Sequence, residues 1–245
     1  MVKEKLKRYR VVLVEPLYEL NVGYIARVMK NFGFTNLHLV APKFKLSNTC
    51  KIFAKHAIDI IERLEIHETL ETVLQDVDLV VGTTGIVGSR RNILRTPLTP
   101  REFAKLITQC HGNIAILFGR EDIGLTNELL SICDVLVTVP ANPKYPVLNL
   151  SHAVAVILYE IYLQEILHGK RAFSVDLPSK YEREAFLEYI LKLLNYIDYP
   201  EHKKKKVLLV FRRIIGKNMV TRGELHILMS FFRRIYLFRT KRESS

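Results

Sequence analysis

The sequence has few cysteines and no pattern that would use them for a metal site. The three cysteines, Cys50, Cys110 and Cys133, are far apart along the chain, and none belongs to a C-x-x-C pair. The eight histidines include no H-x-x-x-H or H-E-x-x-H arrangement. Structural and catalytic zinc sites generally use such closely spaced ligands. We therefore expect buried, reduced thiols and no metal site.

Long hydrophobic runs that would target or cross a membrane are also missing. The first ten residues, Met1 to Arg10, are rich in Lys and Arg and lack the apolar core of a signal peptide. No run approaches the roughly 18 apolar residues that span a bilayer. We therefore expect a soluble cytoplasmic protein with no membrane partner.

The glycine-rich loops that usually bind nucleotides are absent. No G-x-G-x-x-G follows the first apolar run, and no G-x-x-x-x-G-K-[ST] occurs anywhere in the chain. These motifs place backbone amides around phosphates, so their absence argues against three classes of enzyme. The classes are NAD-dependent enzymes, P-loop NTPases and the common Rossmann-type methyltransferases.

Positive charge is abundant and unevenly distributed. The formal net charge is +12, and residues 170–245 contain 18 Lys and Arg against 8 Asp and Glu. Residues 1–169 contain 19 against 17, so the surplus is +10 in the last part and +2 in the rest. A concentrated basic surface is typical of proteins that bind polyanions, because each neutralised phosphate releases counterions. A solvated helical surface has the same composition, so charge alone leaves both interpretations open.

Hydrophobic patterning in the first 168 residues alternates short apolar runs with amphipathic stretches. A chain of 245 residues with 49% hydrophobic content can bury one large core, or a large and a small one. Strands are expected at Arg10–Glu15, Leu37–Ala41, Asp78–Thr83, Ile114–Phe118 and Val135–Val139, with a weaker candidate at Glu65–His67. Helices are expected at about 21–33, 50–63, 69–75, 100–110, 125–131 and 149–168. This alternation predicts an α/β fold whose parallel sheet is covered on both faces.

A change of pattern at residues 169–180 predicts a linker between a domain over 1–168 and a second domain over 181–245. Gly169 and Pro178 favour the end of a helix, and the chain beyond them is purely helical and basic. Capping boxes at Ser179–Glu182 and Thr221–Glu224 predict the starts of two helices. A middle helix over about 203–216 would turn Val207, Leu208, Phe211, Ile214 and Ile215 inward and Lys204, Lys205, Arg212 and Arg213 outward.

Three motifs contain residue types that core packing alone does not require. The first is Asn21–Arg27 (N-V-G-Y-I-A-R), and the second is Gly119–Gly124 (G-R-E-D-I-G), which follows an apolar run. The third is Pro140–Ala153 (P-A-N-P-K-Y-P-V-L-N-L-S-H-A). Their order and composition resemble the motif set of the SpoU branch of the SPOUT RNA methyltransferases, and within it the TrmJ type. The resemblance covers residues from about 10 to 168.

The resemblance implies a trefoil-knotted sheet and an S-adenosylmethionine-dependent enzyme that methylates a ribose 2′-hydroxyl in RNA. In this family, backbone groups of three turns surround the bent cofactor. Carried onto this sequence, the cofactor residues are Thr83, Thr84, Gly85, Gly119, Val139, Pro146, Val147 and Leu148. Glycine lets the backbone approach a ligand closely, and proline stiffens a loop. For Gly119, an ordinary strand-to-helix turn explains the glycine equally well.

The same resemblance implies a catalytic set of Arg27, Asn21, Glu121, Asn149 and Ser151. Because a guanidinium keeps its proton, we expect Arg27 to bind an RNA phosphate and stabilise developing alkoxide charge. Glu121 is either a general base or a residue that orients Arg27, Asn21 or a backbone amide. Asn21, Asn149 and Ser151 are also good helix N-cap residues, so a structural role stays open for each.

RNA contacts are expected in two regions of the chain. Arg90 and Arg91 follow a glycine-containing turn and offer phosphate contacts, and Tyr145 can stack on a base. The basic helical domain offers a second surface through the four outward residues of its middle helix. The TrmJ-type resemblance implies tRNA as the partner, cytidine or uridine 32 in the anticodon loop as the target, and a homodimer paired through the knotted domain.

Three alternatives remain open at this point. The first is a SpoU-type 2′-O-methyltransferase for another tRNA position or for ribosomal RNA. The second is a non-catalytic knotted protein that binds RNA without methyl transfer. The third is an unrelated α/β nucleotide-binding enzyme with an incidental basic tail, which would prefer nicotinamide or ATP to S-adenosylmethionine.

Overall fold

The computed structural model describes residues 2–86, 97–108, 110, 112–167, 176–217 and 220–242. The chain divides into two compact units, Met1–Phe173 and Ser174–Ser245. We call them the N-terminal unit and the helical unit, and each is described by itself. Much of the expected linker over 169–180 lies outside the described residues, so its limits stay a prediction.

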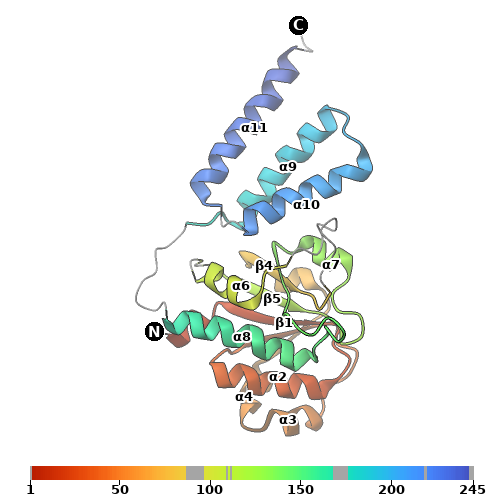
Figure 1. Ribbon diagram of the computed structural model, residues 1–245, viewed down its shortest axis with the longest axis vertical. Coiled ribbons are helices and arrows are strands. Elements are labelled where there is room, and N and C mark those ends of the chain that lie inside the picture. The colour runs from red at the N-terminus through yellow and green to blue at the C-terminus, as the bar shows by residue number, and fades with distance from the viewer. Residues whose placement is uncertain are drawn as a thin grey trace. The chain divides into compact units, whose positions relative to one another are not determined.

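The N-terminal unit is built on a six-stranded sheet with the order β3-β2-β1-β5-β4-β6 (Figure 1). Its strands are β1 (Tyr9–Val14), β2 (Asn36–Val40), β3 (Glu65–His67), β4 (Leu79–Thr83), β5 (Ile114–Phe118) and β6 (Val135–Val137). All five pairings are parallel. The predicted α/β class and the six predicted strands are confirmed. β6 ends two residues before its predicted end, which leaves Val139 in a loop.

Helices precede or follow the strands as the patterning predicts, with one break. They are α1 (Val2–Leu6), α2 (Glu19–Phe32), α3 (Asn48–Ala54), η1 (Lys55–Ala57), α4 (Ile58–Arg63), α5 (Leu70–Val73), α6 (Pro100–Ile107), α7 (Asn127–Ile132) and α8 (Leu150–Leu167). The single helix expected over 50–63 is divided into α3, η1 and α4, because Lys55 adopts a positive φ of 52° that a continuous helix cannot contain.

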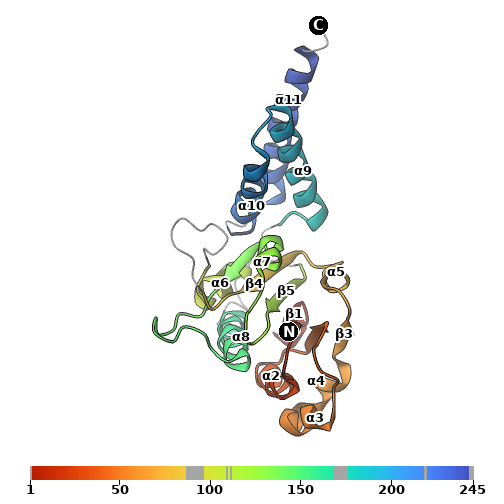
Figure 2. The same ribbon diagram turned by 90° about the vertical axis from the view of Figure 1, so that its right-hand side faces the viewer.

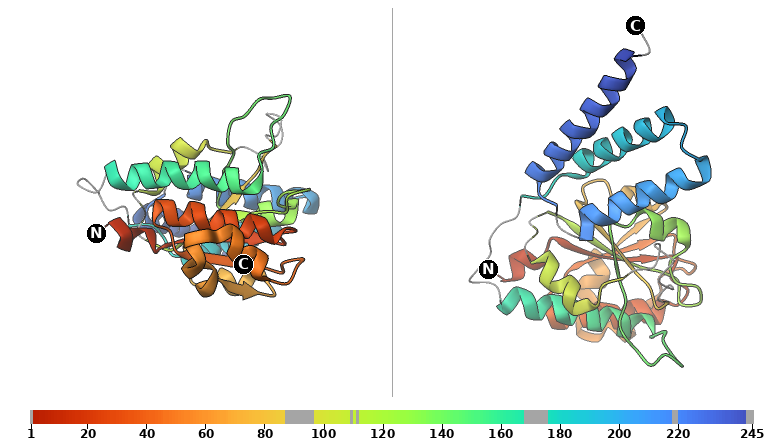
Figure 3. Two further views of the ribbon diagram at one scale, coloured as in Figure 1. Left: turned by 90° about the horizontal axis from the view of Figure 1, so that it is seen from below. Right: turned by 45° about the horizontal axis from the view of Figure 1, so that its top comes forward.

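The two faces of the sheet are covered by different helices. Val12, Val14 and Val40 form a core with Val73 of α5 and Leu130 of α7. α2 and α8 pack against each other over the opposite face, where Figures 2 and 3 show them side by side. Strands that are apolar on both sides suit this arrangement, since every side chain meets a protein surface.

The strand order shows that the chain does not add strands consecutively. β5 lies between β1 and β4, although β4 comes before it in the sequence. The segments after β4, β5 and β6 therefore meet at one edge, the C-terminal ends of three neighbouring strands. The knot that the family resemblance implies stays a prediction.

α8 is long and apolar enough, by length and composition, to cross a membrane, but half of it is buried within the unit. It packs on α2 and α6 and contains buried Glu165. Glu165 accepts hydrogen bonds from Arg8 at 2.7 Å and from the Tyr9 hydroxyl at 2.6 Å. Burial raises the pKa of Tyr9 well above its ordinary value. These contacts are those of a core helix anchored to β1.

The helical unit consists of α9 (Lys180–Tyr196), α10 (Glu201–Lys217) and α11 (Arg222–Arg242), with α9 packed against both of the others (Figure 2). Phe186 and Leu225 are fully buried in its core. The rings of Phe186 and Phe211 meet edge to face, 5.7 Å between centroids. The inward position predicted for Ile214 is wrong, because its side chain is 47% exposed while Ile215 is buried.

Both predicted capping boxes of the helical unit are present. Ser179 accepts from the backbone N–H of Glu182, whose carboxylate accepts from the backbone N–H of Ser179. Thr221 and Glu224 make the same reciprocal pair at the start of α11. Each box satisfies N–H groups that have no partner within their helix, so the sequence alone marks these two helix starts.

Candidate active site

A pocket opens in the N-terminal unit at the C-terminal ends of β4, β5 and β6. The segments that follow these strands form its walls, and α8 contributes Leu150, Ala153 and Ile157. Its empty volume is about 850 Å³, part of which is open to solvent. Ligands of open α/β sheets bind at this edge, because the loops there converge. We call it the strand-end pocket.

The residues expected to surround the cofactor gather in the strand-end pocket. Those that line it are Thr83, Thr84, Gly85, Gly119, Val139, Val147 and Leu148. The remaining one, Pro146, is exposed beside Val147 and is not among the lining residues. Sequence reasoning missed the apolar wall from α8, although the apolar run after Asn149 marked this helix as a core element. The lining is largely apolar, with the acidic turn after β5 along one side.

Gly119 is required by its own turn. A Cβ atom at this position would lie 2.1 Å from the backbone carbon of Gly124, far inside contact distance. Gly124 itself adopts a left-handed φ of 68° and donates its N–H to the carbonyl of Arg120. The strand-to-helix turn is therefore sufficient to explain this glycine, and close approach to a ligand is not needed.

Glu121 holds two segments that lie about a hundred residues away in the sequence. Its Oε2 accepts the backbone N–H of Leu17 at 2.8 Å, and its Oε1 accepts the side-chain amide of Asn21 at 2.8 Å. Both carboxylate oxygens are thus engaged by donors of the loop and helix after β1. Of the two roles considered for Glu121, the contacts favour orientation of Asn21 and a backbone amide.

Asn21 is not a helix N-cap. α2 begins at Glu19 with Tyr18 in the cap position, so Asn21 lies inside the first turn and is buried. Its carbonyl oxygen is 3.4 Å from the amide nitrogen of Asn149. The N-cap interpretation of Asn21 is therefore wrong, and its side chain instead joins Glu121 to the third motif.

Asn149 caps the start of α8 and also reaches the first motif. Its Oδ1 accepts the backbone N–H and the hydroxyl of Ser151, each at 2.8 Å, as a residue before a helix does. Its Nδ2 points to Asn21. A chain of hydrogen bonds therefore runs from Glu121 through Asn21 and Asn149 to Ser151.

A second hollow, the Arg27 groove, lies between α2 and α8. Asn21, Arg27, Asn149 and Ser151 line it, together with Leu20, Tyr24, Val28, Asn31, His152 and Ala155. Within the described part of the chain, the exposed Arg27 side chain has no hydrogen-bond or ion-pair partner. A guanidinium on a groove wall is available for a phosphate or another anion.

The strand-end pocket and the Arg27 groove share a polar wall. Glu121 lines the pocket, Asn21 and Asn149 line the groove, and direct hydrogen bonds connect the three. A small molecule in the pocket and a larger substrate along the groove would thus be held on either side of one connected network. This arrangement suits group transfer between two bound molecules, because orientation of both reactants lowers the barrier.

In the acidic turn after β5, residues 119–124, charged side chains bind each other. Arg120 donates to Asp122 through two nitrogens, at 3.0 and 2.7 Å, and lies 3.8 Å from Glu15. These bonds lower the pKa of the Asp122 carboxyl, so the pair stays ionised near neutral pH. Arg120 and Asp122 both line the pocket, although neither was predicted as a site residue from the sequence.

Of the expected RNA-contact residues of the N-terminal unit, only Tyr145 lies within the described residues. Arg90 and Arg91 lie outside the described residues. Tyr145 is 82% exposed in the loop of the third motif, where its ring is free to stack on a base. It is not among the residues that line either hollow.

The basic residues of the helical unit are only partly as predicted. Lys205 is exposed, but Lys204 pairs with Glu201 and Arg212 pairs with Glu184, and both are half-buried. Arg213 is half-buried as well, so the outward position is wrong for these three side chains. The ion pair of Lys204 lies within α10, whereas that of Arg212 reaches α9. Near the start of α10, the exposed lysines are Lys203, Lys205 and Lys206.

Comparison with known families identifies the class of protein to which the chain belongs. Residues 8–159 match the model of the SpoU rRNA methylase family. The chain belongs to this family. It is accordingly an S-adenosylmethionine-dependent RNA ribose 2′-O-methyltransferase with the SPOUT fold.

The similarity to other proteins covers both units of the chain. It is 41% identical to the tRNA (cytidine-2′-O-)-methyltransferase TrmJ of Methanocaldococcus jannaschii over 227 residues, 91% of this chain and 97% of that one. It is 33% identical to the enzyme of the same name from Sulfolobus acidocaldarius, over 96% of both chains. The crystal structure of TrmJ from Z. mobilis superposes with a TM-score of 0.68 at 26% identity, over 92% of this chain and 98% of that one.

The strand-end pocket has the surfaces that S-adenosylmethionine needs. Apolar side chains such as Leu125 and Ile157 can pack against the adenine and the methylthio region, and backbone groups of three turns are available for its polar edges. The side chains of Glu121 and Asp122 on one side are of the acidic type that suits its sulfonium and ammonium charges. The residues present therefore fit this cofactor.

Proposed function

We propose that this enzyme methylates the ribose 2′-hydroxyl of nucleotide 32 in the anticodon loop of tRNA, with cytidine or uridine as the base. The observation that carries the proposal is the polar wall shared by the strand-end pocket and the Arg27 groove. The two relatives above are named for 2′-O-methylation of cytidine in tRNA. Position 32 rests on the resemblance of the three motifs to the TrmJ type. A tRNA substrate also favours a cytoplasmic location.

In this proposal the strand-end pocket holds the cofactor through Thr83, Thr84, Gly85, Gly119 and the loop at Val147. S-adenosylmethionine, when bound, supplies an electrophilic methyl group. Pro146 would stiffen this loop rather than touch the ligand, since it does not line the pocket.

Arg27 is the proposed catalytic residue for the RNA. Its exposed guanidinium stands in the groove beside Asn21 and Asn149, where a phosphate next to the target ribose could bind in a bidentate manner. A guanidinium generally keeps its proton, and the positive charge would stabilise the alkoxide that develops as the hydroxyl attacks. Fixed donors of this kind contribute most where water is excluded.

Asn21, Glu121, Asn149 and Ser151 are proposed as positioning residues. Both Glu121 oxygens already accept hydrogen bonds in the structure, so proton removal is not assigned to it. The network instead joins α2, the acidic turn and the start of α8. Loss of one link would shift the RNA relative to the cofactor, and small shifts strongly slow an oriented reaction.

We also propose a homodimer that completes the Arg27 groove. Exposed apolar side chains flank this groove on both helices, with Leu20 and Tyr24 on α2 and Val156 and Tyr159 on α8. Such a patch on neighbouring helices suits a second copy of the chain. Light scattering on the purified protein, with Tyr24→Glu as the variant, tests this part: the variant is expected to be monomeric and to lose methyl transfer.

The target is tested with methyl-labelled S-adenosylmethionine and tRNA transcripts. A transcript with a 2′-deoxynucleotide at position 32 should lose the label, while one with a deoxynucleotide at position 34 should keep it. Label that persists without the hydroxyl at 32 would move the target to another ribose. Absence of label on any tRNA or ribosomal RNA, with RNA binding intact, would support a non-catalytic RNA-binding protein.

A further inference from the structure

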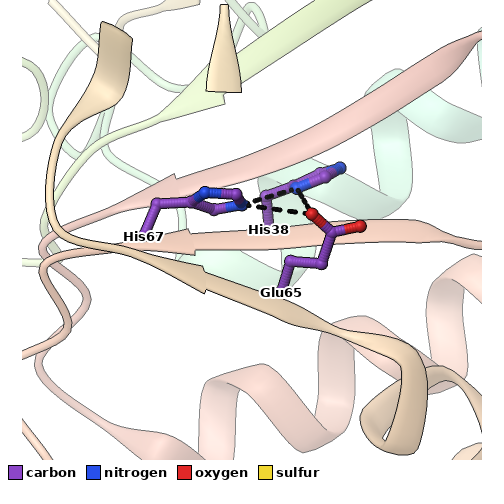
Figure 4. Close-up of side chains that lie close together, drawn as sticks. All are labelled: His38, Glu65 and His67. Carbon is purple, nitrogen blue, oxygen red and sulfur yellow. Dashed lines mark hydrogen bonds and ion pairs between the residues drawn. The ribbon is translucent and has the colours of Figure 1, made fainter. Parts of the chain in front are cut away.

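Two histidines and a glutamate meet on the edge of the sheet, away from both hollows (Figure 4). His38 is on β2, and Glu65 and His67 are on the edge strand β3. The parallel register pairs His38 with Glu65 and Val40 with His67. Since side chains two apart share a face of a strand, all three side chains project from the same face.

The donor atoms of this cluster have the spacing of a metal site. His38 Nδ1 lies 3.1 Å from His67 Nε2, and Glu65 Oε2 lies 3.8 and 3.5 Å from these two nitrogens. Zinc bonds of about 2.0–2.1 Å place the ligand atoms of a tetrahedron about 3.3–3.4 Å apart. The three distances scatter around this value, so a single ion could contact all three atoms after small side-chain movements.

The hydrogen bonds around His67 orient its ring towards the cluster. The Thr72 hydroxyl donates its single proton to the carbonyl of Thr69 at 2.8 Å. Thr72 Oγ1 is then left to accept from His67 Nδ1, 3.3 Å away. His67 Nε2 is the ring nitrogen that faces His38 and Glu65. Metal-binding histidines are commonly oriented by such a second bond.

Burial favours the uncharged form of His38. His38 is 7% exposed, and its burial lowers its pKa, an effect to which Arg10 and His67 add while Glu65 and Asp76 oppose it. In a neutral imidazole the proton can move from Nδ1 to Nε2. Nδ1 of His38 then has a lone pair to offer to an ion, alongside Nε2 of His67. The Glu65 side chain is 64% exposed, which leaves the cluster accessible to an ion and to water as a fourth ligand.

We propose that His38, Glu65 and His67 form a binding site for a zinc-like divalent cation. Two imidazoles and a carboxylate are a ligand set that zinc uses, with the fourth position left to solvent. The ion would join β3, which has only three residues, to β2. The proposed role of the ion is therefore to stabilise the pairing of the edge strand β3 with β2. No sequence motif marks the site, because strand pairing brings its ligands together.

The test is titration of the purified, chelator-treated full chain with Co²⁺, followed by Zn²⁺ competition. Visible absorption of four-coordinate Co²⁺ should saturate at one equivalent per chain, and Zn²⁺ should displace it and raise the melting temperature. Glu65→Gln should weaken binding about tenfold or more, and His67→Gln should abolish the absorption.

Controls separate this site from other ligands and from misfolding. His56→Gln changes an exposed histidine outside the cluster and should bind Co²⁺ like the parent. Glu65→Gln retains all three thiols and alters an exposed side chain, so its circular dichroism should match the parent. Equal affinity in Glu65→Gln and the parent, or no saturable binding by the parent, would overturn the proposal.

Discussion

The two units of this protein are specified in different ways. In the N-terminal unit, the polar wall joins Leu17, Asn21, Glu121 and Asn149, and its hydrogen-bonded partners are separated by up to 128 positions. In the helical unit, the polar contacts that define the helix starts join residues three positions apart, as in the boxes at Ser179 and Thr221. Long-range contacts thus build the candidate site, while local contacts define where the helices of the helical unit start.

The units also differ in how their charges are used. Residues 170–245 contain 18 Lys and Arg against 8 acidic residues, yet Lys204 and Arg212 are held in ion pairs within the unit. In the N-terminal unit, Arg27 is exposed on the groove wall without such a pair in the described part of the chain. The count of basic residues therefore overstates the surface that can meet RNA. Three predictions test this contrast.

The largest effect is expected from Arg27→Ala. Methyl transfer should fall by about a hundredfold to a thousandfold, as when a stabilising donor is removed. S-adenosylmethionine affinity should stay within a few-fold, because Arg27 lines the groove and not the strand-end pocket. Single-turnover kinetics and calorimetry measure the two quantities. Arg63→Ala, which removes an exposed arginine of α4, is the control, and near-normal turnover of Arg27→Ala would remove Arg27 from the mechanism.

An intermediate effect is expected from replacing Lys203, Lys205 and Lys206 together by Glu. Affinity for tRNA should fall about tenfold or more at moderate salt, and the salt dependence should lose roughly one unit of slope per lost phosphate contact. Filter binding at several salt concentrations measures both. The matched control replaces Lys45, Lys51 and Lys55, three exposed lysines of the N-terminal unit, and has the same change in net charge. Equal losses in the two variants would mean that only net charge matters.

The smallest effect is expected from removing one cap in each unit. Ser179→Ala and Thr99→Ala each delete the hydroxyl of a capping box, at α9 and α6, and should cost about 0.5–2 kcal/mol of unfolding free energy. Hydrogen exchange resolved by segment should show faster exchange in the unit that carries the change. Ser230→Ala, an exposed serine of α11, should have no effect. Faster exchange in both units after either change would show that they unfold together.

Most of the secondary structure could be predicted from the sequence because it depends on local chemistry. Apolar runs marked the strands, and paired capping residues marked the starts of α9 and α11. The errors arose where packing or backbone geometry overrides the local pattern. Lys55 divides an expected helix by its positive φ, and Ile214 is exposed where helical periodicity placed it inward.

The candidate site shows the same limit. The motifs singled out Asn21, Arg27, Glu121 and Asn149, but only the structure shows the hydrogen-bond partners of Asn21 and Glu121. Asn21 looked like a helix cap because its chemical type and its place near a helix start allow that role. A residue type states which bonds are possible, and the partner that it meets is set by the chain's path elsewhere.

The sequence by itself determined the α/β class, the helical character of the C-terminal part, the family and the positions of its motifs, since each depends on neighbouring residues or on ordered motif composition. Only the tertiary structure decided which lysines are exposed, that Gly119 serves its own turn, and that one polar wall separates two hollows. It alone also brought His38 to Glu65 and His67, because strand pairing joins residues about 27–29 positions apart, a distance that no local pattern encodes.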